Sequence, residues 1–137
     1  MVKRGKIMIK TEGFLDFVNL TPDIVNELKA LEVRDGNALV FCAGSTAAIT
    51  SAEFEPGMKR DVKKYFNKLF PSTDDYAHNI IANDDNGASH LLSAIIKPSF
   101  VFPVVDGSPI LGRWQQIVFI ECDMRARTRE ILLSITE

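Results

Sequence analysis

The pattern of apolar and polar residues predicts strands near both ends of the chain. Apolar and polar positions alternate over residues 5–11, and this period of two predicts an opening strand. Gly13 interrupts the alternation, and residues 14–18 predict a second strand, which we expect to form a hairpin with the first. Continuous apolar runs at residues 38–42 and 117–122 predict two strands in the core, the first of them central in the sheet.

Three segments with a helical period lie between these strands. Thr21 is a suitable N-cap for the first helix, and Pro22 suits the turn that follows it. Asp85 or Asn86 can cap the third helix, and Pro98 ends it. The expected helices cover residues 21–31, 56–69 and 86–97.

The remaining segments complete an α+β domain. Residues 99–105 predict a strand that Pro103 places at an edge or beside a bulge, and residues 106–109 predict a turn. Residues 131–135 predict the last strand. Strands and helices in this order favour a single α+β domain over residues 1–137 with a mostly antiparallel sheet.

Composition narrows the class of protein. The 137 residues carry a net charge of −2 and 46% of them are hydrophobic, which suits one globular domain and gives no reason to expect a nucleic-acid partner. We find no signal peptide and no apolar run long enough to span a membrane. Cys42 and Cys122 lie inside apolar runs, so we expect them to be reduced core thiols in a cytoplasmic protein.

Residues 78–92 hold the only two histidines of the chain. A cap at Asn86 puts His90 in the first turn of its helix, where the positive end of the helix dipole disfavours the imidazolium form. We expect the residues before this helix, from His78 on, to form a loop. A neutral imidazole can ligate a metal or act as a base, so this loop and both histidines can form one polar site. The plainer alternative is that residues 84–87 only cap the helix.

Two further features carry candidate chemistry. Residues 43–50 are small and rich in hydroxyl groups, and they follow a core strand. Their amides and hydroxyls, chiefly those of Ser45 and Thr46, can hold a small anion, or the segment is a plain bend between strands. Glu121 lies inside an apolar strand, where it is either a buried partner of one of the arginines that we expect in the next turn or an edge-strand carboxylate.

Several motifs occur in one order along the chain. They are Ser45-Thr46-Ala47-Ala48, Glu53 with Glu55, His78, Asp85-Asn86-x-x-x-His90-Leu91, Pro98-Ser99, Asp106-Gly107, Leu111-Gly112-x-Trp114-Gln115 and Glu121-x-Asp123. With these motifs the chain resembles the YjbQ family, to some members of which a secondary thiamine-phosphate synthase activity is ascribed. The resemblance implies an α+β fold with one mixed, largely antiparallel sheet and about three helices. It also implies a homotrimer with pockets between subunits.

The resemblance also implies a set of site residues. The catalytic candidates are Glu53, His78, Asp85 and His90, and the substrate-binding candidates are Ser45, Thr46, Asn86, Trp114 and Gln115. We add Arg113 to the substrate-binding candidates from its own chemistry. Two positions depart from the family pattern. Gly44 stands where the family has a histidine, and the loss of that imidazole weakens the expectation of catalysis. Arg113 stands where a small residue is usual, and it either reaches a phosphate or is an exposed turn arginine.

The implied reaction joins a pyrimidine methyl diphosphate to a thiazole phosphate. It needs charge stabilisation and positioning more than a strong nucleophile. Asp85 and Glu53 can hold Mg²⁺ or another divalent metal, Trp114 can stack on a heteroaromatic ring, and either histidine can move a proton.

Two other functions stay open. The first is non-catalytic binding of a small phosphorylated metabolite, which Gly44 favours. The second is metal-dependent hydrolysis, with His78, His90 and Asp85 as metal ligands and an open position for water.

Overall fold

The computed structural model describes residues 1–137 and has an α+β architecture built on two antiparallel sheets. The larger sheet has the order β1 (Val2–Lys10), β8 (Thr128–Thr136), β3 (Gly36–Phe41), β5 (Ser99–Val105) and β6 (Ser108–Pro109). The smaller sheet has the order β2 (Phe17–Asn19), β7 (Gln115–Glu121) and β4 (Ala47–Glu53). The α+β class is confirmed, whereas the single mixed sheet is replaced by two sheets in which every pairing is antiparallel.

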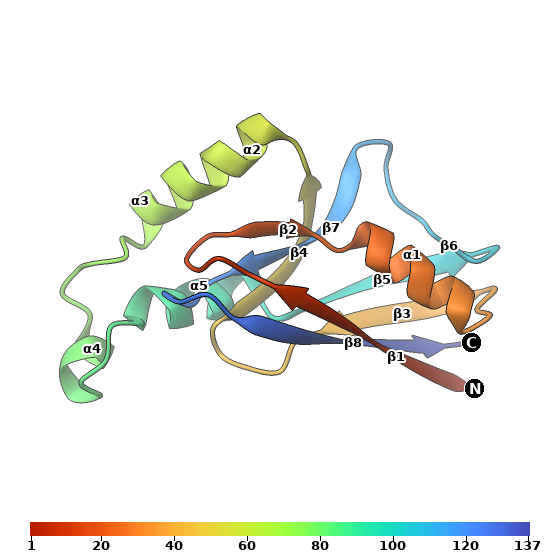
Figure 1. The fold of residues 1–137 in the computed structure, drawn as a ribbon, viewed down its shortest axis with the longest axis horizontal. Coiled ribbons are helices and arrows are strands. Elements are labelled where there is room, and N and C mark those ends of the chain that lie inside the picture. The colour runs from red at the N-terminus through yellow and green to blue at the C-terminus, as the bar shows by residue number, and fades with distance from the viewer.

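Four helical segments accompany the sheets (Figure 1). They are α1 (Thr21–Ala30), a continuous helix made of α2 (Pro56–Asp61), the π-helical turn η1 (Val62–Phe66) and α3 (Asn67–Leu69), then α4 (Ala77–Ile81) and α5 (Gly87–Ile96). The three expected helices are confirmed, and α4 is an addition, since we expected a loop there. No helix is both long enough and apolar enough to cross a membrane.

The expected hairpin between the first two strands is wrong. β1 pairs with β8, and β2 pairs with β7 in the other sheet. The chain crosses between the sheets over a few residues, because Thr11 N–H still donates to Arg127 O at 2.8 Å while Leu15 N–H already donates to Glu121 O at 2.7 Å. Alternation predicts that a segment is extended, but it does not select the partner strand.

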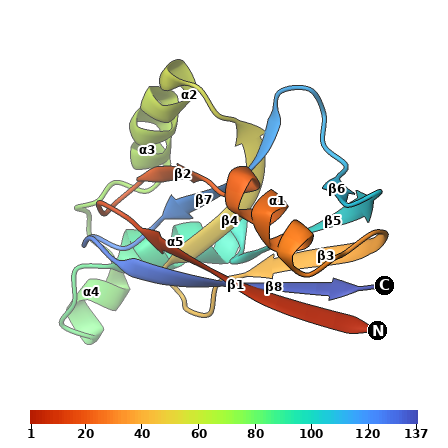
Figure 2. The same cartoon turned by 45° about the vertical axis from the view of Figure 1, so that its right-hand side comes forward.

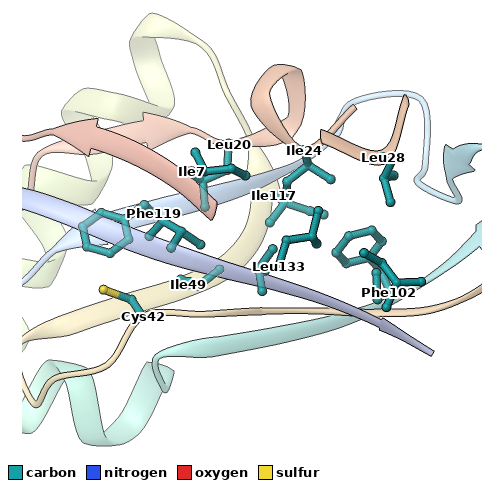
Figure 3. Packing of buried hydrophobic residues seen from close by; sticks show 14 of the residues in the cluster. Ile7, Leu20, Ile24, Leu28, Cys42, Ile49, Phe102, Ile117, Phe119 and Leu133 are labelled. Atoms are coloured by element: carbon teal, nitrogen blue, oxygen red, sulfur yellow. The ribbon is translucent and has the colours of Figure 1, made fainter. Parts of the chain in front are cut away.

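The smaller sheet is buried on both faces. Ile117 and Phe119 of β7 face a core shared with α1 and the larger sheet, and Figure 3 shows them among side chains from those elements. Val118 and Ile120 face a second core, where residues of the long helix and of α5 pack. This burial explains the continuous apolar run of β7.

Local chemistry adjusts two helix starts. Leu20, and not Thr21, is the N-cap of α1, and the Thr21 hydroxyl instead accepts from Ile117 N–H at 2.9 Å. The Glu55 carboxylate caps α2 by accepting from the N–H groups of Gly57 and Met58. Thr21 therefore joins its helix to the smaller sheet, and Glu55 satisfies two of the backbone donors that the first turn of α2 leaves free.

Candidate functional site

His90 is fixed at the start of α5 by a hydrogen bond to a distant loop. Its Nδ1 lies 3.0 Å from the carbonyl oxygen of Ser45. A carbonyl oxygen only accepts, so Nδ1 carries the hydrogen and a neutral His90 keeps its lone pair on Nε2. The predicted helix boundary at Asn86 is confirmed, and His90 lies in the first turn as expected.

His78 faces His90 from α4. The two imidazole rings meet edge to face, with centroids 4.6 Å apart and planes at 77°. His78 Nε2 lies 2.9 Å from Asn86 Oδ1, which assigns the hydrogen to Nε2 and leaves Nδ1 as the acceptor in the neutral ring. The structure thus brings together three predicted site residues, His78, Asn86 and His90. Each histidine keeps one ring nitrogen that has no partner in the chain.

Two contacts hold α4 against α5. Asn79 Oδ1 accepts from Gly87 N–H at 2.8 Å, which satisfies one of the free donors at the start of α5. Gly87 also permits close packing, because a Cβ at this position would lie 2.7 Å from Cβ of Tyr76. The Tyr76 hydroxyl donates to Pro71 O at 2.6 Å, and burial, with the charge of Asp74 adding to it, raises the pKa of Tyr76.

His90 separates two open hollows on the surface. The first, which we call the Ser45 hollow, has a volume of about 310 Å³ and is lined by Gly44, Ser45, His90, Ser93, Ala94, Lys97 and Pro98. The second has a volume of about 320 Å³ and is lined by Tyr76, Ala77, His78, Gly87, His90 and Leu91. A ligand in either hollow can therefore meet His90.

The loop acids lie at the edge of this region. Asp85 N–H donates to Asp84 Oδ1 at 2.8 Å, and this hydrogen bond is the main cause that lowers the pKa of Asp84, with the charges of His78 and Arg125 adding to it. The chain has no group of three or more His, Cys, Asp or Glu side chains placed to hold a metal ion. The two imidazoles alone give fewer protein ligands than a catalytic zinc site uses, so we derive no chemical step through a metal.

A buried ion pair lies beneath the loop that bears Ser45. Glu121 is fully buried and pairs with Arg129, which is 4% exposed. Burial lowers the pKa of Arg129, but the hydrogen bond and the charge of Glu121 raise it more, so the net shift is upward. The reading of Glu121 as a buried partner of an arginine is confirmed, whereas the placement of Arg129 in a turn is wrong.

The position of Arg129 could have been found in the sequence. In β8 the buried residues Ile131, Leu133 and Ile135 alternate with more exposed ones, and Arg129 falls on the buried side of this period. The thiols are as expected, since Cys42 and Cys122 are both free and buried. Burial, together with the charge of Glu121, raises the pKa of Cys122 to about 12, so this thiol stays protonated at neutral pH.

The other predicted site residues lie at the far end of β4. Ala47 pairs with Glu121 near the Ser45 hollow, and Glu53 pairs with Gln115 six residues further along. At the rise of an extended strand this separation is roughly 20 Å. Figures 1 and 2 show α4 and the loop before β7 on opposite sides of the molecule.

That far end forms a third hollow of about 370 Å³. We call it the Trp114 hollow, and it is lined by Asn19, Glu53, Phe54, Glu55, Arg113, Trp114 and Gln116. The guanidinium of Arg113 lies 4.9 Å from the ring centroid of Trp114, which is 64% exposed. Gln115 is held by Ser51 Oγ, to which its Nε2 donates at 3.0 Å. Within one chain the predicted site residues therefore form two separate clusters, one around His90 and one around Trp114.

Comparison with known proteins identifies the family. A family described as UPF0047 protein YjbQ-like has a sequence model that matches residues 5–137. This chain belongs to the YjbQ-like UPF0047 family. A UPF0047 protein of Methanocaldococcus jannaschii is 32% identical over 95% of this chain and 91% of its own length. The UPF0047 protein YugU of Bacillus subtilis is 31% identical, over 89% of this chain and 92% of its own length.

Solved structures of YjbQ-like proteins share the fold. A YbjQ-like protein of unknown function from Sulfolobus solfataricus P2 matches with a TM-score of 0.91 and 30% identity, over 98% of this chain and 96% of the other. A conserved protein of the YjbQ/UPF0047 family from Clostridium acetobutylicum matches with a TM-score of 0.86 and 30% identity, over 96% and 99% of the two chains. The family resemblance and the α+β fold class are therefore confirmed.

Proposed function

We propose that this YjbQ-like protein binds a phosphorylated small molecule in the Ser45 hollow. The observation that carries the proposal is the hydrogen bond from His90 Nδ1 to Ser45 O, which fixes the imidazole at the wall of this hollow. Ser45 supplies a hydroxyl, and Lys97 supplies an ammonium group that takes part in no ion pair within the chain. A hydroxyl, a cation and an imidazole together suit phosphate oxygens.

The two histidines suit proton transfer to or from a ligand held beside them. Each neutral ring keeps one acceptor nitrogen, because His78 and His90 each direct their N–H to an oxygen of the protein. This pair favours a second, catalytic function, transfer of the thiamine-phosphate synthase type. In that reaction the thiazole nitrogen bonds to the pyrimidine methylene carbon while the bond from that carbon to the diphosphate breaks, and an imidazole protonated on its free nitrogen can donate to the departing diphosphate. Gly44 supplies no imidazole of its own, so such catalysis would rest on these two histidines.

We also propose that a homotrimer joins the two clusters across a subunit boundary. Glu53, Arg113, Trp114 and Gln115 are too distant from His90 to meet the same small ligand in one chain. An apolar hollow of about 260 Å³ next to α5, lined by Phe66, Leu69, Phe70, Leu92, Ile95 and Ile96, suits burial against another subunit. In such an assembly Trp114 of one chain would face the ligand bound near His90 of another.

Isothermal titration calorimetry with phenyl phosphate tests the binding proposal. We expect saturable binding to the wild-type protein and at least a tenfold loss of affinity in Lys97→Ala and in His90→Ala. Lys29→Ala is the matched control, because Lys29 lies on α1, away from the hollow, and should leave the affinity unchanged. Equal affinity in all four proteins would sink the placement of the site at His90.

Two further measurements separate the functions and test the assembly. Formation of thiamine phosphate from the pyrimidine diphosphate and the thiazole phosphate, lost in His78→Ala and His90→Ala, would establish the transferase. Binding of both substrates without product would leave the protein as a binder. Light scattering that gives the mass of a single chain would remove the trimer.

A further inference from the structure

The Arg129 guanidinium is buried, but one of its three nitrogens has no protein partner. Nε donates to Glu121 Oε2 at 2.9 Å, and Nη2 donates to Glu121 Oε1 and to both oxygens of Thr46. Nη1 donates to no acceptor in the chain. Since Ser89 Oγ is the only fully buried side-chain nitrogen or oxygen without a partner, Nη1 must retain contact with solvent.

Nη1 is uncovered at Gly44, because this residue has no side chain. A Cβ built at Gly44 would have a single neighbour within 4 Å, which is Arg129 Nη1 at 3.7 Å. Any side chain here would cover the guanidinium, whereas glycine leaves it open. Gly44 also lines the Ser45 hollow together with His90 and Lys97, so one residue borders both the hollow and Nη1.

The charge of Glu121 does not remove the ability of Arg129 to bind an anion. The two carboxylate oxygens already accept from the Thr11 hydroxyl and from Asp123 N–H as well as from the guanidinium. Within the guanidinium, only Nε and Nη2 donate to Glu121. Nη1 is therefore free to donate to another acceptor. Because Nη1 meets solvent and not a protein acceptor, an oxyanion that reaches it can accept a charge-assisted hydrogen bond without displacing a protein partner.

The surrounding backbone and side chains add donors. The N–H groups of residues 43–46 donate to no acceptor in the chain, and they flank Gly44 on both sides. The carboxyl end of α5 also meets the hollow at Lys97, and its partial negative charge there opposes an anion. The ammonium of Lys97 offsets that charge, which leaves Arg129 as the cation held rigidly at the site.

We propose that Arg129 Nη1, exposed through the gap at Gly44, is the donor that binds the phosphate group of the ligand. This inference rests on the proposed binding function and names its phosphate subsite. The phosphate oxygens accept from Nη1 and from the Ser45 hydroxyl, with Lys97 providing further positive charge. The rest of the ligand extends toward His90. Gly44 thus sets the specificity, because a larger residue at this position would exclude the phosphate.

Nuclear magnetic resonance of the ¹⁵N-labelled protein tests this subsite directly. Inorganic phosphate is titrated at constant ionic strength, with chloride as the comparison, and the Arg129 side-chain signals are followed with the amides of Ser45, His90 and Lys97. We expect phosphate, and not chloride, to shift the Arg129 signals saturably.

Gly44→Asp should weaken phosphate binding at least tenfold, because its carboxylate would pair with Nη1 and repel phosphate. Gly107→Asp is the matched control. It makes the same change of charge at another glycine with positive φ, in the turn between β5 and β6, and should bind phosphate as the wild type does.

The outcomes separate this inference from the binding proposal. If the amide signals of Ser45, His90 and Lys97 shift but the side-chain signals of Arg129 do not, the binding site is retained and the role of Arg129 is overturned. Equal phosphate affinity in Gly44→Asp and Gly107→Asp would overturn it as well. No shift at any of these residues would remove both proposals. If Gly44→Asp does not fold, the wild-type Arg129 signals alone decide the question.

Discussion

The two ends of β4 present polar residues in very different settings. At the Ala47 end, Ser45 and Thr46 are tied to His90 and Arg129, and Ser93 Oγ donates to Ala47 O at 2.6 Å. At the Glu53 end, Glu53, Arg113 and Trp114 are all exposed. The first end is part of the framework of the protein, and the second is an open surface.

This difference teaches which residues can be changed without changing the fold. Thr46 and Ser93 at the Ala47 end have buried hydrogen-bond partners, so loss of those partners leaves donors or charges unsatisfied. Groups at the Glu53 end lose few contacts when they are truncated. Stability should therefore respond mainly at the Ala47 end, and any effect of the Glu53 end should appear in ligand binding or assembly.

The largest effect is expected for Arg129→Met. This change leaves the fully buried Glu121 without its cation, which should lower the free energy of unfolding by about 3–5 kcal/mol. Urea denaturation measures the change. The double variant Glu121→Gln with Arg129→Met is the control, and it should recover part of the loss because no charge is then left buried. A loss below about 1 kcal/mol in the single variant would show that the pair is not buried as described.

Gly87→Ala should act next most strongly. The new methyl group would lie 2.7 Å from Cβ of Tyr76, so α4 must move, at a cost of about 1–3 kcal/mol. The same movement should separate His78 from His90 and shift the imidazole resonances of both. Gly112→Ala is the matched control at the Glu53 end, where the nearest atom would be 3.6 Å away. Unchanged histidine resonances in Gly87→Ala would contradict the packing of α4 on α5.

Glu55→Ala should have an intermediate effect. It removes the carboxylate that accepts from Gly57 and Met58 at the start of α2, and the loss of such a cap costs about 1 kcal/mol. Glu53→Ala is the control, because Glu53 is near in sequence and exposed but caps no helix. Thermal unfolding should separate the two variants. Equal melting temperatures would mean that the cap contributes nothing.

Trp114→Ala should have the smallest effect on the fold. The residue is 64% exposed and its ring packs against the Arg113 guanidinium, so the unfolding free energy should fall by less than about 1 kcal/mol. Affinity for phenyl phosphate should nevertheless fall if the trimer brings Trp114 to the ligand. Full retention of both affinity and trimer mass would leave the Glu53 end without a role in the site.

Several elements could be predicted because their signals are local. The continuous apolar run of β7, the helical period of α5 and the charged Glu121 within an apolar strand all gave correct predictions. The buried place of Arg129 was missed although its period-two signal is present, because the neighbouring arginines at 125 and 127 suggested an exposed turn. The helix α4 is only five residues long, too short to show a period among turn-forming neighbours.

The sequence by itself determined most of the strands, the longer helices and the family, because each depends on side chains close together along the chain. It did not predict β4, since the small hydroxyl residues at 43–50 indicated an anion-binding segment or a bend. Only the tertiary structure decided which strands pair and which polar groups meet. Ser45 and His90 are 45 positions apart, and Glu121 meets Thr11 across 110 positions. The antiparallel register of β4 and β7 also placed Trp114 far from His90, although the resemblance assigned both to one site. Such contacts depend on how the sheets and helices pack, and no local pattern encodes that packing.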